Sequence, residues 1–272
     1  MRVIFLGEGR LAFTCLNILL QREFSRVFKL NTLVSSETFY SNLVKSYSFQ
    51  NNLNFVSNNS RSEDQIVELI EREKINTLIS VQHKWIMSKK ILNKFGCNAF
   101  NFHNAKLPEY KGYNSLSHSI LNGDSKHFMT IHRVDPEVDA GDIVLESSIT
   151  ISKDETALSL YKKTISGTED LFSNFLKKLN QNTLEGKSQK GESKFFKKSS
   201  LTKLRELDLK ADKSYLNRVI RALYFPPYEP AYFILNDQKV YCLPNNKENS
   251  WLNVKPANKS DWDLKSSNNF EF

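Results

Sequence analysis

The sequence predicts an α/β fold: a Rossmann-like, mostly parallel sheet with helices on both faces, followed by a small C-terminal module containing a β-hairpin. Two observations carry this prediction. Short apolar runs of β type alternate with amphipathic helical patterns in the first half of the chain, an order that favours parallel strands joined by helices. After Leu179 the composition changes to Lys, Gly, Ser and Gln, which suits a linker or surface excursion. We therefore expect one domain over residues 1–200 and a module over residues 201–272.

The first half of the chain contains five strand candidates. Each is a short run of apolar or β-branched residues without an interior proline. They are Val3–Leu6, Leu30–Val34, Asn54–Val56, Thr77–Val81 and Ala99–Phe102. Apolar residues with helical spacing lie between them, as in Leu11–Leu20, in the segment after Ser62 and in Ile86–Leu92.

The second half continues with two further strand candidates and one long helix. Phe128–Val134 and Ile143–Ile151 are the strands, and a helix with an apolar stripe runs from Leu158 to Leu179. Ser152 and Glu155 have the spacing of a capping box at its start. Beyond residue 200, Asn236 and Asp237 join the apolar runs Ala231–Leu235 and Val240–Leu243, as in a hairpin. The tail after Pro244 is mostly polar.

Composition excludes several classes of protein. Of the 272 residues, 40% are hydrophobic and 25% charged, which is ordinary for a globular protein, and no apolar run reaches the ~18 residues that cross a bilayer. Three cysteines lie far apart without metal-ligand spacing, which favours a cytoplasmic protein without structural zinc. The net charge of +8 fits a lysine-rich surface or a site for an anionic substrate. No arginine-rich stretch with interleaved aromatics points to nucleic acid.

A glycine loop follows the first strand candidate. Gly7 to Ala12 match the loose dinucleotide fingerprint G-x-G-x-x-A, and an acidic residue, Glu37, comes near the end of the next strand. NAD binding by an oxidoreductase is therefore one hypothesis. Glycines at a first strand–helix turn also serve tight backbone packing, so the loop alone does not decide between the two.

The strongest chemical signal is Asn101 and His103 at the end of a strand candidate. Two positions apart on a strand, they share one face, and a Pro- and Gly-containing loop follows. Ligands bind beyond the carboxyl ends of strands in open parallel sheets. An amide can stabilise an oxyanion there, and an imidazole can move a proton near neutral pH. Asp139 and Asp142, in a polar stretch between two strands, are the candidates for a carboxylate that orients the imidazole.

These residues together resemble the 10-formyltetrahydrofolate-dependent formyltransferases. The pattern N-x-H, L-P-x-Y-x-G and D-x-G-D stands here as Asn101/His103, Leu107–Gly112 and Asp139–Asp142, and the segment Arg221–Tyr228 resembles the nucleotide-sugar members. The resemblance implies that Asn101, His103 and Asp139 are catalytic and that 10-formyltetrahydrofolate is the co-substrate. It also implies that no metal is needed and that the glycine loop is a feature of the fold.

The resemblance further suggests the acceptor and the residues that bind it. The short, aromatic-rich C-terminal module favours a dTDP-linked amino-dideoxy sugar, first dTDP-4-amino-4,6-dideoxyglucose and next its 3-amino isomer, for surface polysaccharide synthesis. A methionyl-tRNA formyltransferase is a further alternative. The candidate binding residues are Gln82, His83, Lys84, Asn104, Lys106, Tyr110, Arg221, Tyr224, Phe225 and Tyr228.

Two expectations complete the sequence-based interpretation. His118, His127 and His132 have no partner pattern, and we interpret them as structural or surface residues. A homodimer built on the C-terminal hairpin is expected, because an isolated two-stranded hairpin is only marginally stable.

Overall fold

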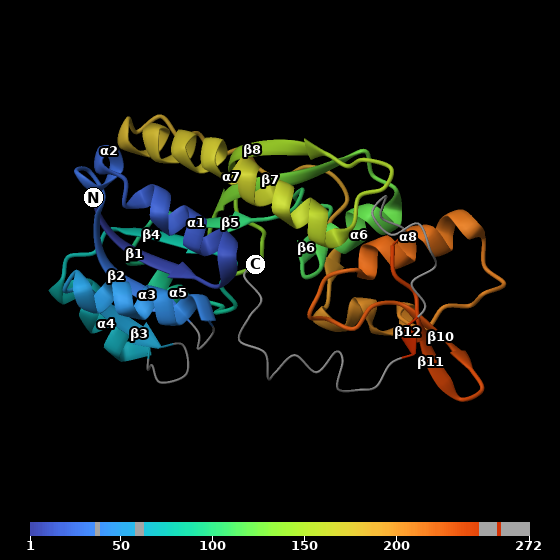
Figure 1. Cartoon of the computed structure of the whole chain (residues 1–272). Coiled ribbons are helices and arrows are strands. Elements are labelled where there is room, and N and C mark those ends of the chain that lie inside the picture. Colours follow the sequence, from blue (N-terminus) through green and yellow to red (C-terminus); the bar gives the residue numbers. More distant parts are fainter. Residues whose placement is uncertain (36–38, 58–62, 245–254, 257–272) are drawn as a thin grey trace. The chain divides into compact units, whose positions relative to one another are not determined.

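The computed structural model describes residues 1–35, 39–57, 63–244 and 255–256 (Figure 1). Glu37, Ser62 and the tail beyond Pro244, apart from Lys255 and Pro256, lie outside the described residues. The chain divides into two compact units. The first unit comprises Met1–Lys111, Phe128–Ser147 and Ile165–Ser193, and the second unit comprises Gly112–His127, Ser148–Thr164 and Lys194–Phe272. These units differ from the predicted division at residue 200, because two earlier segments group with the C-terminal residues.

A seven-stranded sheet in the order β3-β2-β1-β4-β5-β7-β8 organises the first unit. Its strands are β1 (Arg2–Gly7), β2 (Lys29–Ser35), β3 (Asn54–Ser57), β4 (Thr77–Val81), β5 (Ala99–His103), β7 (Lys126–Arg133) and β8 (Ile143–Thr150). Neighbouring strands from β3 to β5 are parallel, whereas β7 is antiparallel to β5. The predicted mostly parallel sheet is confirmed.

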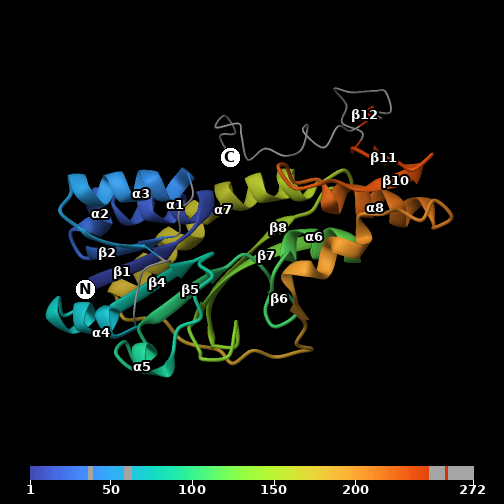
Figure 2. The ribbon, with the colours of Figure 1, turned by 90° about the horizontal axis from the view of Figure 1, so that it is seen from below.

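Helices cover both faces of this sheet, as predicted. Figure 2 shows α1 (Gly9–Leu19) and α3 (Phe39–Gln50) along one face, and α4 (Glu63–Arg72) and α5 (Lys89–Leu92) along the other. A short helix, α2 (Arg22–Ser25), follows α1, and α7 (Ala157–Asn180) contributes residues to both units.

The centre of the sheet is buried because its strands are almost entirely apolar. Every residue of β4 is buried, as are all residues of β1 after the first. Strands covered on both faces need such continuous apolar runs. On one face, Ile4 and Leu78 pack with Ile66 of α4 and Ile91 of α5 in a single cluster. This rigid centre fixes the carboxyl ends of β4 and β5, where the candidate site begins.

The second unit is built mainly from helices. It contains α6 (Ser115–Asn122), α8 (Lys213–Leu223), a 3₁₀ helix, η1 (Lys198–Leu204), and a short β9 (Phe195–Phe196) that pairs with β6 (Lys111–Gly112). Val219 and Leu223 of α8 pack with Leu201 and Leu207, while Ala222 packs with Ile120 and Leu160. The apolar residues of α8 therefore lie in two small cores.

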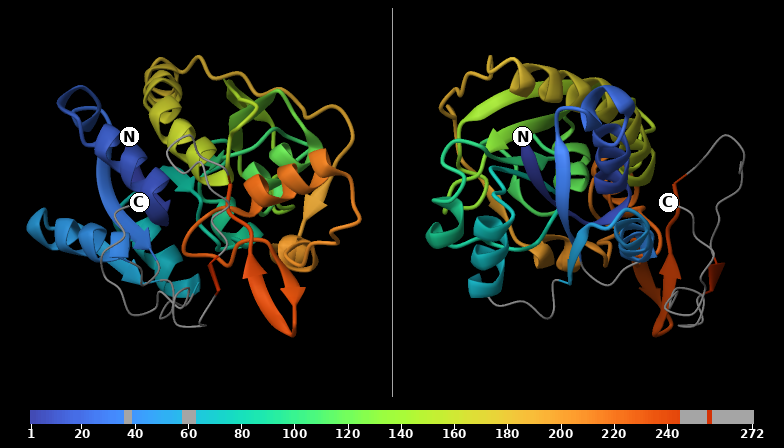
Figure 3. Two further views of the ribbon diagram at one scale, coloured as in Figure 1. Left: turned by 45° about the vertical axis from the view of Figure 1, so that its right-hand side comes forward. Right: turned by 90° about the vertical axis from the view of Figure 1, so that its left-hand side faces the viewer.

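The predicted C-terminal hairpin is present. Strands β10 (Tyr232–Leu235) and β11 (Gln238–Tyr241) pair antiparallel, and β12 (Lys255–Pro256) joins β11 (Figure 3). Asn236 and Asp237 form the turn with φ of 49° and 60°. Positive φ at both central residues is typical of the type I′ turn, which Asn and Asp tolerate better than most residues.

Candidate active site

Asn101, His103 and a third polar residue, His132, line up on neighbouring strands of the first unit. Asn101 and His103 alternate along β5 and therefore share a face. In the antiparallel pairing of β5 with β7, His132 lies directly opposite Asn101, and Thr130 lies opposite His103. Directly opposed residues project to the same side of a sheet. The pairing thus places an imidazole beside the Asn101 amide.

Asp139 reaches both histidines from the loop between β7 and β8. Its Oδ1 lies 3.7 Å from Nδ1 of His103 and 3.6 Å from Nε2 of His132. The Asp139 side chain is only 9% exposed, and its backbone has a φ of 52°. A non-glycine residue in this left-handed region is uncommon. The structure therefore brings together the three residues that the sequence singled out, with His132 among them.

The hydrogen bonds of His132 determine its tautomer. Its Nδ1 lies 2.7 Å from the carbonyl oxygen of Arg133, an acceptor only, so Nδ1 carries a proton. In the neutral ring, Nε2 is then an acceptor, and it lies 3.1 Å from Nδ2 of Asn101. The Asn101 amide nitrogen donates to His132, which fixes the orientation of this amide. Among the described residues, the second hydrogen of that nitrogen has no protein acceptor.

The same reasoning applies to His103. Its Nε2 lies 2.8 Å from the carbonyl oxygen of Tyr110 and so donates to it. In the neutral ring Nδ1 is then unprotonated and is the nitrogen nearest Asp139. The 3.7 Å separation is too long for a hydrogen bond, yet a proton taken up by Nδ1 would create an imidazolium beside a carboxylate. His103 is thus arranged to accept a proton at Nδ1.

The loop after β5 contains three of the candidate binding residues. Asn104 and Tyr110 are buried, and Lys106 pairs with Glu109 at 2.7 Å. Thr130 of β7 donates to the carbonyl oxygen of Ala105 at 2.6 Å, which ties the loop to the sheet. Through Tyr110, the loop also provides the acceptor for His103.

Gln82, His83 and Lys84 follow the carboxyl end of β4, as expected. Lys84 Nζ contacts the carboxylate of Glu8 at 2.7 Å, and Glu8 is only 7% exposed. The backbone nitrogen of Trp85 donates to Nδ1 of His83 at 3.2 Å. A lysine predicted to bind a substrate anion therefore already has a buried carboxylate as partner.

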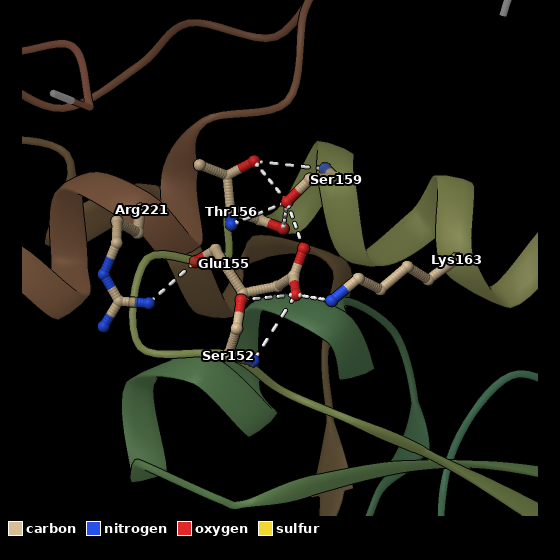
Figure 4. Close-up of polar contacts among 6 residues, drawn as sticks. All are labelled: Ser152, Glu155, Thr156, Ser159, Lys163 and Arg221. Atoms are coloured by element: carbon tan, nitrogen blue, oxygen red, sulfur yellow. Dashed lines mark hydrogen bonds and ion pairs between the residues drawn. The ribbon is translucent and has the colours of Figure 1, made fainter. Parts of the chain in front are cut away.

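The remaining binding candidates belong to the second unit. Phe225 contacts Tyr161 and Tyr228 with ring centroids 5.4 and 6.0 Å away, and Tyr228 is 63% exposed. The carbonyl oxygen of Tyr224 accepts from Leu158. Arg221 donates to the carbonyl oxygen of Glu155 at 2.7 Å (Figure 4). Burial lowers the pKa of the Arg221 guanidinium from its usual value.

The predicted capping box does not start the long helix. The Ser152 hydroxyl donates to the Glu155 carboxylate at 2.9 Å (Figure 4), but α7 begins at Ala157, two residues after Glu155. The reciprocal cap is made by Thr156 and Ser159. Burial acts to raise the pKa of Glu155, but hydrogen bonds from Lys163, Ser159 and Ser152 outweigh it and lower the pKa below its usual value.

Comparison with known proteins assigns the chain to a family. The family model described as "Formyl transferase" matches residues 26–176, which is more than half of the chain. The chain belongs to the formyl transferase family. Six strands of the seven-stranded sheet, β2 to β5, β7 and β8, lie within the matched residues, and they include the strand that carries Asn101 and His103.

Relatives of this formyl transferase family member include two kinds of enzyme. A GDP-perosamine N-formyltransferase of Brucella melitensis is 30% identical over 168 residues, which cover 62% of this chain and 64% of the relative. A methionyl-tRNA formyltransferase of Fusobacterium nucleatum is 26% identical over 168 residues, covering 60% and 54%. The chain thus spans less than two thirds of the length of the curated relatives it matches.

Solved structures share the fold over most of the chain. A 4-N formyltransferase from Francisella tularensis has a TM-score of 0.73 at 20% identity and covers 89% of this chain and 96% of its own. An N-formyltransferase from Helicobacter canadensis, in complex with folinic acid and dTDP-3-aminofucose, has a TM-score of 0.70 at 22% identity, covering 88% and 85%. At these identities the likeness concerns the fold.

The glycine loop of this family member is explained by packing. A Cβ on Gly7 would lie 2.7 Å from both Cβ of Ala12 and the ring of Phe5, so the close approach of strand and helix requires glycine. The NAD hypothesis raised from this loop is not favoured by the family match. Within the described residues, no helix is long and apolar enough to span a membrane. The same residues include no group of three or more His, Cys, Asp or Glu side chains that could hold a metal ion.

Sequence reasoning missed His132, which it treated as structural or surface. The residue is 2% exposed and contacts both Asn101 and Asp139. Its placement depends on β7 pairing antiparallel with β5, and no local pattern reports that register. The two other histidines in that group are also buried: His118 lies 2.8 Å from Ser200, and His127 lies 3.0 Å from Ser119.

Proposed function

We propose that this chain transfers a formyl group from 10-formyltetrahydrofolate to the amino group of a dTDP-linked amino-dideoxy sugar. The observation that carries the proposal is the cluster of Asn101, His103, His132 and Asp139 at the edge of the sheet, in a chain of the formyl transferase family. The cluster contains the three functions that acyl transfer to an amine requires: an amide donor, a proton acceptor and a carboxylate.

His103 and Asp139 handle the proton of the attacking amine. As the amine nitrogen bonds to the formyl carbon it loses a proton, and Nδ1 of His103 accepts it. Asp139, 3.7 Å away, compensates the charge of the resulting imidazolium. When the bond between the formyl carbon and the folate nitrogen breaks, His103 returns the proton to that nitrogen. The ring therefore starts and ends the cycle in the same state.

Asn101 stabilises the oxyanion of the tetrahedral intermediate. One hydrogen of its amide nitrogen is held by His132, and this contact directs the second hydrogen. A donor whose direction is fixed before the reaction costs no reorganisation in the transition state. Protonated His103 contributes positive charge to the same oxyanion.

The acceptor is proposed from the relatives and from the second unit. One relative acts on GDP-perosamine, and one structural neighbour holds dTDP-3-aminofucose. The exposed Tyr228 and its neighbour Phe225 offer aromatic rings for a nucleobase, and Arg221, on the preceding helix α8, offers a cation. Within this proposal dTDP-4-amino-4,6-dideoxyglucose is the first choice and its 3-amino isomer the second. The proposal also includes that the protein is a cytoplasmic homodimer and that its product is used in surface polysaccharide synthesis.

Incubation with 10-formyltetrahydrofolate and a panel of amino sugars tests the proposal. The panel contains the 3-amino and 4-amino dTDP-dideoxy sugars and GDP-perosamine, charged initiator tRNA is assayed in parallel, and release of tetrahydrofolate is followed. Turnover with a dTDP-sugar is expected. Turnover only with charged initiator tRNA would assign the chain to the tRNA class, which the methionyl-tRNA formyltransferase relatives make the second candidate. Tight calorimetric binding of NAD, without formyl transfer, would contradict both.

A further inference from the structure

Gln189 contacts the backbone on both sides of Ala140. Its Nε2 lies 2.8 Å from the carbonyl oxygen of Asp139 and 2.8 Å from that of Gly141. An amide nitrogen has two hydrogens, so it can donate to both carbonyls at once. The opposite orientation would place Oε1 against two carbonyl oxygens, so the chemistry fixes this one.

The fold brings Gln189 to this turn by a short antiparallel pairing. Ile143, at the start of β8, and Lys187 exchange backbone hydrogen bonds of 2.9 and 2.8 Å. Two residues after Lys187 and two residues before Ile143, the same antiparallel register brings Gln189 opposite Gly141. The segment expected to be a linker or surface excursion therefore contributes to the site.

The turn that Gln189 contacts combines an unfavourable backbone conformation with close packing. Asp139 has a φ of 52°, in a region that costs a non-glycine residue free energy. Gly141 packs so closely that a Cβ would lie 1.9 Å from the carbonyl oxygen of Arg133. The backbone nitrogen of Ala140 donates to Glu137 over 3.3 Å, a long hydrogen bond. The two hydrogen bonds from Gln189, at 2.8 Å each, are shorter than this one.

We propose that Gln189 is a positioning residue, which holds the Asp139 turn so that the carboxylate stays in reach of His103 and His132. The inference rests on the proposed function, because it treats Asp139 as a catalytic carboxylate. Without Gln189 Nε2, the two hydrogen bonds to the carbonyls of Asp139 and Gly141 are lost and the turn relaxes. A displacement of about 1 Å at a catalytic group can lower a rate by ~10²-fold.

The test is the variant Gln189→Met, which keeps the side chain's length but removes both donors. We expect kcat to fall roughly 10- to 100-fold, with little change in KM for either substrate, because the lost contact acts on a catalytic group rather than on substrate binding. Gln189→Lys, whose ammonium can donate to both carbonyls, should recover most of the activity. The matched control is Gln181→Met, since Gln181 is exposed just after α7. Wild-type kcat in Gln189→Met would overturn the proposal.

A double-mutant cycle separates positioning from general destabilisation. In an Asp139→Asn background, where the carboxylate is already lost, Gln189→Met should cost less than about twofold in residual kcat, because the two residues act as a unit. A full additive loss would contradict the proposal.

The crystal structure of Gln189→Met provides a readout that needs no activity. A displaced Asp139 carboxylate supports positioning even if the wild-type protein formylates none of the acceptors, in which case only the proposed function fails. An unmoved turn overturns the inference whatever the activity.

Discussion

At the scale of residues, the site depends on which nitrogen of each imidazole carries its proton. Backbone carbonyls of Tyr110 and Arg133 hold the protons on Nε2 of His103 and on Nδ1 of His132. The two rings therefore have opposite tautomers. In the proposed mechanism, this difference would let His103 accept a proton from the substrate while His132 orients the Asn101 amide.

The choice between two aspartates gives the first prediction. Asp139→Asn should lower kcat by ~10²- to 10⁴-fold, because the amide cannot compensate an imidazolium. The matched control is Asp142→Asn, since Asp142 contributes its backbone carbonyl to Arg133 and lies outside the two histidine contacts of Asp139. Steady-state kinetics measure both, and equal losses in the two variants would defeat the assignment.

Replacing His132 tests the orientation of Asn101. His132→Leu removes the acceptor of the Asn101 amide, so kcat should fall by about 10-fold or more, toward the ~10²-fold that the loss of an oxyanion donor costs. His132→Gln offers an amide oxygen as a substitute acceptor and should retain more activity. Rates for the two variants that are indistinguishable from each other would argue against this role for the ring.

Among the helices and strands of the second unit, a buried histidine connects α6 with η1 and β9. His118 of α6 lies 2.8 Å from the Ser200 hydroxyl of η1, and its ring stacks on Phe196 with a centroid distance of 3.8 Å. Asn114 contacts the same hydroxyl at 3.2 Å. These contacts connect residues 78 to 86 positions apart within one unit.

Acidification should loosen this connection. Burial lowers the pKa of His118 from 6.5 to about 4, so between these values the unfolded chain binds a proton that the folded chain does not. The contribution of the neutral His118 to the free energy of unfolding is therefore fully present above pH 6.5, and it decreases as the pH falls toward 4. Urea denaturation at several pH values measures how the free energy of unfolding changes with pH. This dependence should be weaker in His118→Gln than in the wild-type protein. An unchanged dependence in that variant would assign it to other groups.

Sequence patterns predicted the individual strands and helices better than they predicted the contacts between these elements. The alternating runs from Val3 to Phe102 predicted the parallel sheet because each buried strand needs a continuous apolar run. The location of His132 and Gln189 had no such signal. Both act through partners 31 to 50 positions away, and those partners are set by the register of β7 and by the Ile143–Lys187 bridge.

At the scale of the whole molecule, the hairpin is the proposed dimer surface. Ile234 and Leu235 on β10 are 45% and 56% exposed. We expect Ile234→Lys to convert a dimer into a monomer, because a buried unpaired charge is costly at an apolar interface. Light scattering after gel filtration measures the mass. Leu209→Lys, at an exposed leucine outside the hairpin, is the control, and an unchanged dimer in Ile234→Lys would exclude the hairpin as the dimer surface.

Gly141 has a consequence for how freely this sequence can vary. Its constraint is space rather than an unusual φ, since any Cβ would overlap the carbonyl oxygen of Arg133. In a saturation library screened for formyl transfer, alanine should therefore fail at this position as completely as tryptophan. At Gly96, where the space for a Cβ is open and only the φ of 54° matters, asparagine should survive. Two glycines of one chain would thus leave opposite substitution profiles.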